Sequence, residues 1–439
     1  MNEPACPCCS FLGKDLFLPW GDTTGEGAEH IKVADEASSA AAADVLSPLE
    51  AWQAIVSARA DVAQQQQQQQ QPIALVDTHG HPHLERTVQY ALKENGDKVS
   101  SYSDERNVVV SITCAVSPLD WNNALEYACR SPHILPALGV HPWYLGDIIM
   151  KDIMESIGST PDKPSPDTNI EQYLNWEWLS ELEKNLRQQT NLIVGEIGLC
   201  KMARFVREFP KALGGKATAM QLQKIVFKKQ IEVAARWRRP VTVHCVSAHG
   251  LLMDTLMEIL NEAKEACSKE ENDETAGTRT SLRNAFPPAI AMHSFTGTAH
   301  HVQHVLDFEK SILCPEQFEV GGKRQRGKKK QQKQQQNEEK DVKDSTDILF
   351  YFGFSHSVNY IMCTSEKAKR KGIEVVRAIP SDRLLVESDV HASVDVILGT
   401  AGATAYAANA RGESLEDVSE SSTRNGLRFI SSLSSRIDS

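Results

Sequence analysis

The sequence has no long hydrophobic run and no leader-like start. No uninterrupted apolar stretch among its 439 residues approaches the ~20 residues that a membrane-spanning helix requires. The first residues, MNEPACPCCSFLGKDLF, lack the basic start and the apolar core of a secretory signal. We therefore expect a soluble protein of the cytoplasm, the nucleus or both, with no membrane partner.

The sequence also lacks the cysteine pattern of small secreted domains that are stabilised by several disulfide bonds. The chain has 10 cysteines in 439 residues, and some stand singly in apolar runs, as Cys114 and Cys363 do. Such thiols are typical of a reduced compartment. Three more, Cys6, Cys8 and Cys9, cluster near the N-terminus, but their spacing matches no zinc finger. We therefore expect reduced and mostly buried thiols.

Positive charge is scarce. The chain has 47 basic and 58 acidic side chains and a net charge of −11. Residues 1–72 hold 3 basic against 10 acidic side chains, whereas residues 321–345 hold 9 basic against 4 acidic ones. This balance excludes a protein that binds nucleic acid over a broad surface. Any chemistry on nucleic acid must therefore take place in a local pocket.

Two low-complexity segments divide the chain. Residues 1–72 are expected to be a disordered extension that ends in the glutamine run Gln64–Gln71, with one candidate amphipathic helix at 48–62. The second segment is a Lys- and Gln-rich insertion at 321–346. Its basic run, Lys323–Lys330, is typical of a solvated loop, with a nuclear import signal as the alternative. We expect a folded domain at 73–435, with the tail and the insertion as candidate docking segments for a protein partner.

Between these segments, strand and helix patterns alternate. Buried-type strands are predicted at 73–77, 108–115, 135–140, 192–197, 241–245, 289–293, 348–354 and 384–387. Helical patterns follow most of them, best seen at 221–237, 251–266, 372–378 and 415–430.

This alternation predicts an α/β fold of the (β/α)8 TIM-barrel class, because eight strand-helix units fit within about 365 residues. The long loops would lie at 146–170, 200–217, 266–287 and 321–346. An open doubly wound sheet is the alternative. No glycine-rich phosphate loop follows the first strand, which argues against that sheet.

Six of the apolar runs end in residues that bind metals. They read VDTHGH at 76–81, GVHPW at 139–143, VGEIG at 194–198, VTVHC at 241–245, IAMHSF at 290–295 and LLVESD at 384–389. A parallel barrel presents the carboxyl ends of its strands at one shared mouth. We therefore expect the side chains at these ends to converge on one site.

These side chains have the chemistry of a divalent-metal centre. His79 and His81 are two residues apart, so both rings project from one face of a strand, with Asp77 in phase to orient them. Glu196 stands between glycines, and a buried carboxylate is costly unless it is paired or metal-bound. The remaining candidate ligands are His244, His293 and Asp389. Four histidines and two carboxylates fit two divalent ions (zinc, magnesium or manganese) that share a bridging carboxylate and a bridging hydroxide.

Taken in order, the motifs resemble the TatD family of metal-dependent deoxyribonucleases, which are TIM-barrel hydrolases. They read D-x-H-x-H, G-x-H-P-W, G-E-I-G-L, P-V-x-x-H, H-x-F-x-G and R-L-L-x-E-x-D. The resemblance covers residues 73–429. It includes Gln223, Phe227 and Gln230 ahead of the fifth strand and the NGLRF run at 425–429.

The resemblance implies roles for the candidate residues. His79, His81 and Asp389 would hold one metal ion. His244 and His293 would hold the second, with Glu196 bridging the two. The implied reaction is hydrolysis of phosphodiester bonds in DNA ends or short single strands, in which metal-bound water supplies hydroxide and Asp389 receives the proton. His141 would face the substrate, with a packed structural corner beside Pro142 and Trp143 as the alternative.

The sequence departs from the family pattern in three places, the last of which covers two residues. Cys200 stands where an Asp usually follows G-E-I-G-L, Val246 stands where an Arg is frequent, and Val390 and His391 replace a small residue and a Pro. These departures keep two alternatives open: a catalytically weak or inactive barrel that acts as an interaction scaffold, and a hydrolase of another ester or amide. No Lys ends the fourth strand, as it would in related amidohydrolases with a carbamylated bridging lysine, which favours a Glu-bridged centre.

The other histidines lack a comparable motif. His391, at the start of a loop, is expected to be exposed, with a role as an additional ligand or proton shuttle as the alternative. We expect surface or structural roles for His249, His300, His301, His304 and His356.

Overall fold

The structure is a computed structural model of the whole chain, in which residues 45–66, 73–86, 108–149, 169–270, 282–313 and 348–434 are described. The predicted disorder of residues 1–44 and the insertion at 321–346 lie outside these ranges, as does most of the glutamine run. Residues Leu46–Ser439 form one compact unit.

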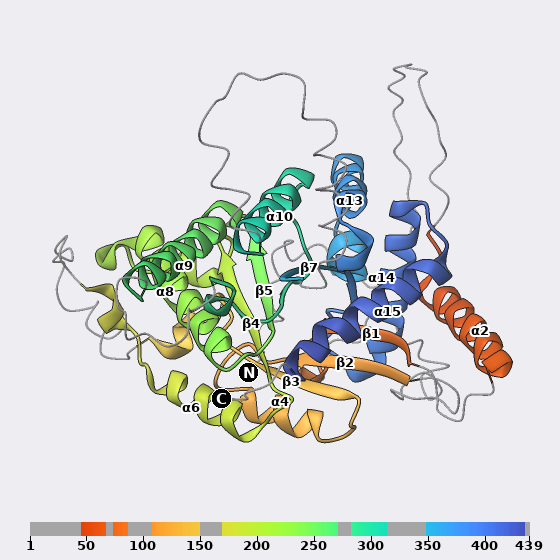
Figure 1. Cartoon of the computed structure of the whole chain (residues 1–439), viewed down its shortest axis with the longest axis horizontal. Coiled ribbons are helices and arrows are strands. Elements are labelled where there is room, and N and C mark those ends of the chain that lie inside the picture. The colour runs from red at the N-terminus through yellow and green to blue at the C-terminus, as the bar shows by residue number, and fades with distance from the viewer. Residues whose placement is uncertain are drawn as a thin grey trace, which may run out of the picture. The chain divides into compact units, whose positions relative to one another are not determined.

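Eight parallel strands form a nearly closed barrel in chain order (Figure 1). They are β1 (Ile73–Gly80), β2 (Val108–Cys114), β3 (Ile134–Leu138), β4 (Ile193–Cys200), β5 (Val241–Val246), β6 (Ile290–Met292), β7 (Phe350–Ser355) and β8 (Leu384–Glu387). Beyond β8 the chain returns to β1, where the Asp389 N–H donates to the His79 carbonyl at 3.0 Å. The predicted TIM barrel is confirmed, and all eight strands occur near their predicted positions.

The strands are apolar because both of their faces are covered. Every residue of β4 and of β7 is buried. Burial on two faces is what a parallel sheet surrounded by helices imposes, and it explains the near-continuous apolar runs of the sequence. A polar side chain inside such a barrel therefore needs a partner or a ligand.

Helices follow the strands and lie outside them (Figure 1). They are α4 (Trp121–Ala128), α6 (Glu177–Gln188), α7 (Arg204–Glu208), α8 (Gly215–Arg236), α9 (His249–Glu270), α10 (Ala299–Leu313), α13 (Glu366–Ala378), α14 (Val396–Arg411) and α15 (Leu415–Ser431). The predicted loop at 200–217 thus contains the short α7. Helix α14 has no sequence prediction, because nearly all of its residues are buried and it lacks a polar stripe. None of the described helices combines the length and apolar content needed to cross a bilayer.

The N-terminal helix α2 (Pro48–Gln66) belongs to the same compact unit as the barrel. It contacts α14 and α15, and Ala51 and Ile55 are buried there (Figure 1). Gly402 of α14 permits the close approach, since a Cβ at that position would lie 3.1 Å from Pro48 Cγ. The candidate helix expected at 48–62 is therefore present as α2, and its small apolar face packs on the barrel.

We expect Ile55→Ala to lower the free energy of unfolding by about 2 kcal/mol, because truncation of a buried side chain leaves a cavity. Gln53→Ala, on the exposed side of α2, should change it by less than about 0.5 kcal/mol. Urea denaturation followed by circular dichroism measures both. Equal stability of the two variants would contradict the packing of α2.

Candidate metal centre

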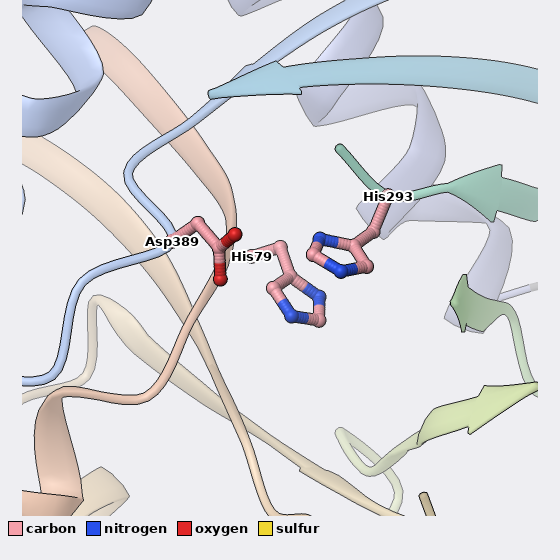
Figure 2. A group of neighbouring side chains, drawn as sticks. All are labelled: His79, His293 and Asp389. Atoms are coloured by element: carbon pink, nitrogen blue, oxygen red, sulfur yellow. The ribbon is translucent and has the colours of Figure 1, made fainter. Parts of the chain in front are cut away.

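The six predicted ligands and His141 lie together at the carboxyl-terminal mouth of the barrel. They belong to β1, β4 and β5 and to the first three residues after β1, β3, β6 and β8. None of them exposes more than 8% of its surface. Figure 2 shows three of these side chains, His79, His293 and Asp389, facing one another from three segments that are far apart in the sequence. The barrel thus brings distant strand ends to one buried point.

Glu196 is the centre of this cluster. Its Oε1 lies 3.2 Å from His141 Nε2, 3.0 Å from His244 Nδ1 and 3.1 Å from His293 Nε2. Its Oε2 lies 3.4 Å and 3.3 Å from the Nε2 atoms of His79 and His81. One carboxylate oxygen offers two lone pairs, so three nitrogens around Oε1 exceed its hydrogen-bonding capacity. This crowding fits cations placed between the nitrogens and the carboxylate.

Unsatisfied atoms support the same interpretation. Glu196 Oε1 and Asp389 Oδ1 are buried without a well-oriented hydrogen bond, which is costly for ionisable groups. Three groups of side chains have ligand atoms within 4.8 Å of one another: His79, His81 and Glu196; His79, His293 and Asp389; His141, Glu196 and His244. Imidazole nitrogen and carboxylate oxygen suit zinc and neighbouring divalent metals. The residues present therefore fit a metal centre.

Outer hydrogen bonds turn the rings towards this centre. His81 Nδ1 lies 2.6 Å from the Cys114 carbonyl, which only accepts, so Nδ1 carries the proton and Nε2 is free. His79 Nδ1 contacts Thr242 Oγ1 at 2.8 Å. His293 Nδ1 contacts Glu387 Oε1 at 3.2 Å. Partners of this kind fix the orientation of metal-binding histidines.

Sequence reasoning missed Thr242 and Glu387 as partners. Glu387 does carry a signal, since it lies two residues before Asp389 in the same run and therefore faces the same side. Gly353 of β7 makes room for it, because a Cβ there would lie 2.2 Å from Glu387 Oε2. Thr242 has no recognisable signal, because its contact depends on how β5 lies across from β1.

Asp77 organises the segment that carries Asp389. Its carboxylate accepts from the Ser388 N–H at 2.7 Å, from Ser388 Oγ at 2.8 Å and from Ser111 Oγ at 3.1 Å. Asp389 itself adopts a left-handed backbone conformation, with φ of 50°, which Asp tolerates better than most residues. Burial raises the pKa of Asp77 to about 7 despite the bonds from Ser388. The predicted orienting role of Asp77 thus acts mainly on the end of β8.

The two carboxylates of the cluster differ in pKa. Burial opposes a charge on Glu196, but His141, His293 and His79 hold its pKa well below the usual range. Burial raises the pKa of Asp389 to about 6, against the lowering effect of His293 and His81. Glu196 is therefore a permanent anion at neutral pH, whereas Asp389 lies near its titration range.

His141 is positioned against Glu196. The Trp143 N–H donates to His141 Nδ1 at 3.3 Å, so in the neutral ring Nε2 carries the hydrogen that points at Glu196. Burial lowers the pKa of His141 to about 4, although Glu196 raises it, so the ring is neutral at pH 7. The ring predicted to face the substrate is 3% exposed and contacts the central carboxylate.

Two departures from the family pattern lie inside the site. The Cys200 side chain hydrogen-bonds His244; burial lowers the pKa of His244, but Cys200 and Glu196 raise it to about 9. His391 is 3% exposed and its ring stacks on His81 at 5.3 Å. The expectation that His391 is exposed is therefore wrong, because its carbonyl accepts from the Arg86 N–H at 2.8 Å and ties this segment to the end of β1.

Two glutamines of α8 hold the strand ends around the site. Gln230 bonds both backbone groups of Val140, at 2.7 Å and 3.1 Å. Gln223 accepts from the Cys200 N–H at 2.9 Å and donates to the carbonyls of Cys200 and Pro142 at 3.2 Å each. The helix therefore fixes the ends of β3 and β4, and with them His141 and Glu196.

Comparisons with known proteins give a family match. The family model described as TatD related DNase matches residues 76–315. That range includes five of the six predicted ligands and ends before Asp389.

Named relatives and a solved structure are also similar. The Cut9-interacting protein scn1 of Schizosaccharomyces pombe is 25% identical over 317 residues, which cover 65% of this chain and 80% of that protein. The uncharacterized deoxyribonuclease YMR262W of Saccharomyces cerevisiae is 29% identical over 209 residues, which cover 42% of this chain and 62% of that protein. A solved TatD homologue of Escherichia coli K12, YJJV, is 16% identical, with a TM-score of 0.43 and coverage of 82% of this chain and 97% of that chain.

We expect Gln223→Met to lower the free energy of unfolding by about 1–3 kcal/mol, because it leaves three buried backbone groups without partners. Gln221→Met, at an exposed position of the same helix, is the matched control and should have little effect. Urea denaturation of both variants checks this. Similar midpoints would contradict the role given to Gln223.

Proposed function

The chain belongs to the TatD related DNase family, and from this premise we propose that it is a two-metal hydrolase of phosphodiester bonds. The proposed substrate is DNA or a short single-stranded nucleic acid. The observation that supports the proposal best is the buried Glu196 carboxylate with five imidazole nitrogens within 3.4 Å. A core that only stabilises the fold does not require a buried carboxylate surrounded by imidazoles.

The proposed ligand assignment is the one that the family resemblance implies. His79, His81 and Asp389 would hold one ion, His244 and His293 would hold the other, and Glu196 would bridge them. His293 stands between both groups, because its ring stacks on His79 with centroids 3.8 Å apart while its Nε2 contacts Glu196. Divalent ions held by these residues would stabilise the charge that develops during displacement at a phosphodiester.

When bound, divalent ions supply a lowered pKa of water and stabilise the charge that develops on the phosphate. The chain's own residues hold and move the proton. Ser294 Oγ donates to Asp389 Oδ2 at 3.1 Å and leaves Oδ1 to accept a proton. His141 remains neutral, and its Nε2 lies 3.2 Å from Glu196 Oε1, where it limits the movement of that carboxylate.

We expect the full-length protein to contain about two divalent ions per chain and to digest a labelled single-stranded oligonucleotide. Glu196→Gln keeps the size of the side chain but removes its charge, so metal content and digestion rate should both fall, the rate by at least about 100-fold. Metal analysis by mass spectrometry and gel-based digestion assays measure these. Glu208→Gln, in an exposed pair with Arg204, is the control. Full metal content and full rate in Glu196→Gln would refute the proposal.

A second candidate function is an interaction scaffold built on the same barrel. One specific observation favours it: a relative that aligns over 65% of this chain carries the name Cut9-interacting protein. The replacement of a carboxylate by Cys200 is consistent with reduced activity. Bound metal without turnover on any phosphodiester, ester or amide would support the scaffold and count against the hydrolase.

Cys200→Asp restores a carboxylate next to His244. A charge-assisted hydrogen bond is stronger than one from a thiol, so we expect metal affinity to rise, by up to about 10-fold. Cys200→Ala removes the partner and should lower it. Calorimetric titration of the metal-free protein with zinc compares the three proteins. Identical affinities would show that Cys200 does not tune the site.

A further inference from the structure

A second histidine cluster lies beside the metal centre, outside the ligand set. It consists of His249 at the start of α9, His300, His301 and His304 in the first turns of α10, and Lys371 on α13. We call these five residues the His-Lys rim. Because α9 and α10 begin just after the carboxyl ends of β5 and β6, the rim lies on the same face of the barrel as the metal centre.

The rim residues contact one another. The His249 and His301 rings stack with centroids 4.4 Å apart and an interplanar angle of 6°. The His300 ring lies 6.2 Å from the rings of both His301 and His304. Lys371 Nζ donates to the Thr296 carbonyl at 3.3 Å, which fixes its charge at the same edge. Five groups that carry or donate protons thus share one surface.

The distance from the rim to the metal centre is short. The His249 ring meets the edge of the Phe295 ring at 5.5 Å, and Phe295 is two residues beyond His293. Two residues of extended chain span at most about 7 Å. The His249 edge of the rim is thus linked through Phe295 to the segment that carries the ligand His293.

The rim lacks a counter-anion in the described part of the chain. Burial lowers the pKa of His249 to about 4, and His301 and Lys371 lower it further by repulsion. Burial, then His300 and Lys371, also lower the pKa of His301. No described carboxylate forms an ion pair with Lys371 or with any of the four rings. His249 Nε2 is, in addition, buried without a hydrogen-bond partner.

We propose that the His-Lys rim binds a backbone phosphate of the nucleic-acid substrate next to the scissile bond. Imidazole and ammonium N–H groups are donors that recognise phosphate oxygens without reading sequence. A local group of N–H donors around the Lys371 ammonium offers a phosphate a binding point on a chain whose net charge is −11. This inference rests on the proposed function for the identity of the ligand.

A charge reversal with a matched control tests the rim. Lys371→Glu places an anion at the rim, whereas Lys369→Glu makes the same change two positions away on α13, where Lys369 pairs with Glu366 at 3.0 Å. Residues two apart on a helix face different directions. The basic run Lys323–Lys330 is common to all proteins compared, so its contribution cancels.

Binding of a fluorescein-labelled oligothymidylate to the full-length protein is measured by anisotropy in EDTA, so that no hydrolysis is needed. We expect Lys371→Glu to weaken binding about 5- to 10-fold and to reduce the slope of log K against log salt by about 0.7, the loss of one phosphate contact to a single strand. Lys369→Glu should stay within about twofold of the wild type. The double variant His300→Gln/His304→Gln, at exposed positions, should weaken binding about threefold.

Equal binding by the Lys371→Glu and Lys369→Glu variants would overturn the inference. A competition experiment gives a second contradicting outcome. If polyglutamate displaces the labelled oligonucleotide as well as unlabelled oligothymidylate of equal charge does, the rim binds acidic proteins and the inference is wrong. The assay is independent of catalysis. If Lys371→Glu does not weaken binding, the hydrolase proposal is unaffected. If Glu196→Gln keeps its metal content and digestion rate, the binding measurement at the rim is still valid.

Discussion

The structure of the barrel mouth depends on one interaction, the convergence of five imidazoles on the buried Glu196 carboxylate. Neither oxygen is more than 3.4 Å from the nitrogens around it. Burial alone would neutralise such a carboxylate, but the surrounding histidines keep its pKa well below the usual range. The cluster thus combines a buried negative charge with lone pairs that lack hydrogen-bond donors. A bound cation can compensate both, whereas an apolar core cannot.

Hydrogen-bond partners outside the cluster hold its side chains in place. Glu387, Thr242 and the Cys114 carbonyl fix the outer nitrogens of three rings. The two α8 glutamines bond backbone groups at the ends of β3 and β4, and Asp77 bonds the backbone that leads to Asp389. His79, His81 and His293 are therefore each oriented by a group on a different element. This is the geometry expected where ligands must be positioned before the metal binds.

The distribution of charge complements this centre. The chain as a whole is acidic, so its long-range field repels nucleic acid. We propose that the rim formed by His249, the histidines of α10 and Lys371 offsets that repulsion locally, on the face of the barrel where the ligands lie. A phosphate bound there would favour strands that enter the site.

The sequence by itself determined the eight strands, the barrel class and the residues gathered at the mouth. Strand ends in a parallel barrel must meet, so chain order and residue type were enough. Only the tertiary structure decided which atoms meet. Thr242 opposite His79, His141 against Glu196 and the burial of His391 depend on how neighbouring strands lie across from each other, which no local pattern encodes. The same holds for α14 and α2: one is apolar all round and the other has a small apolar face, so both are defined by their packing rather than by their periodicity.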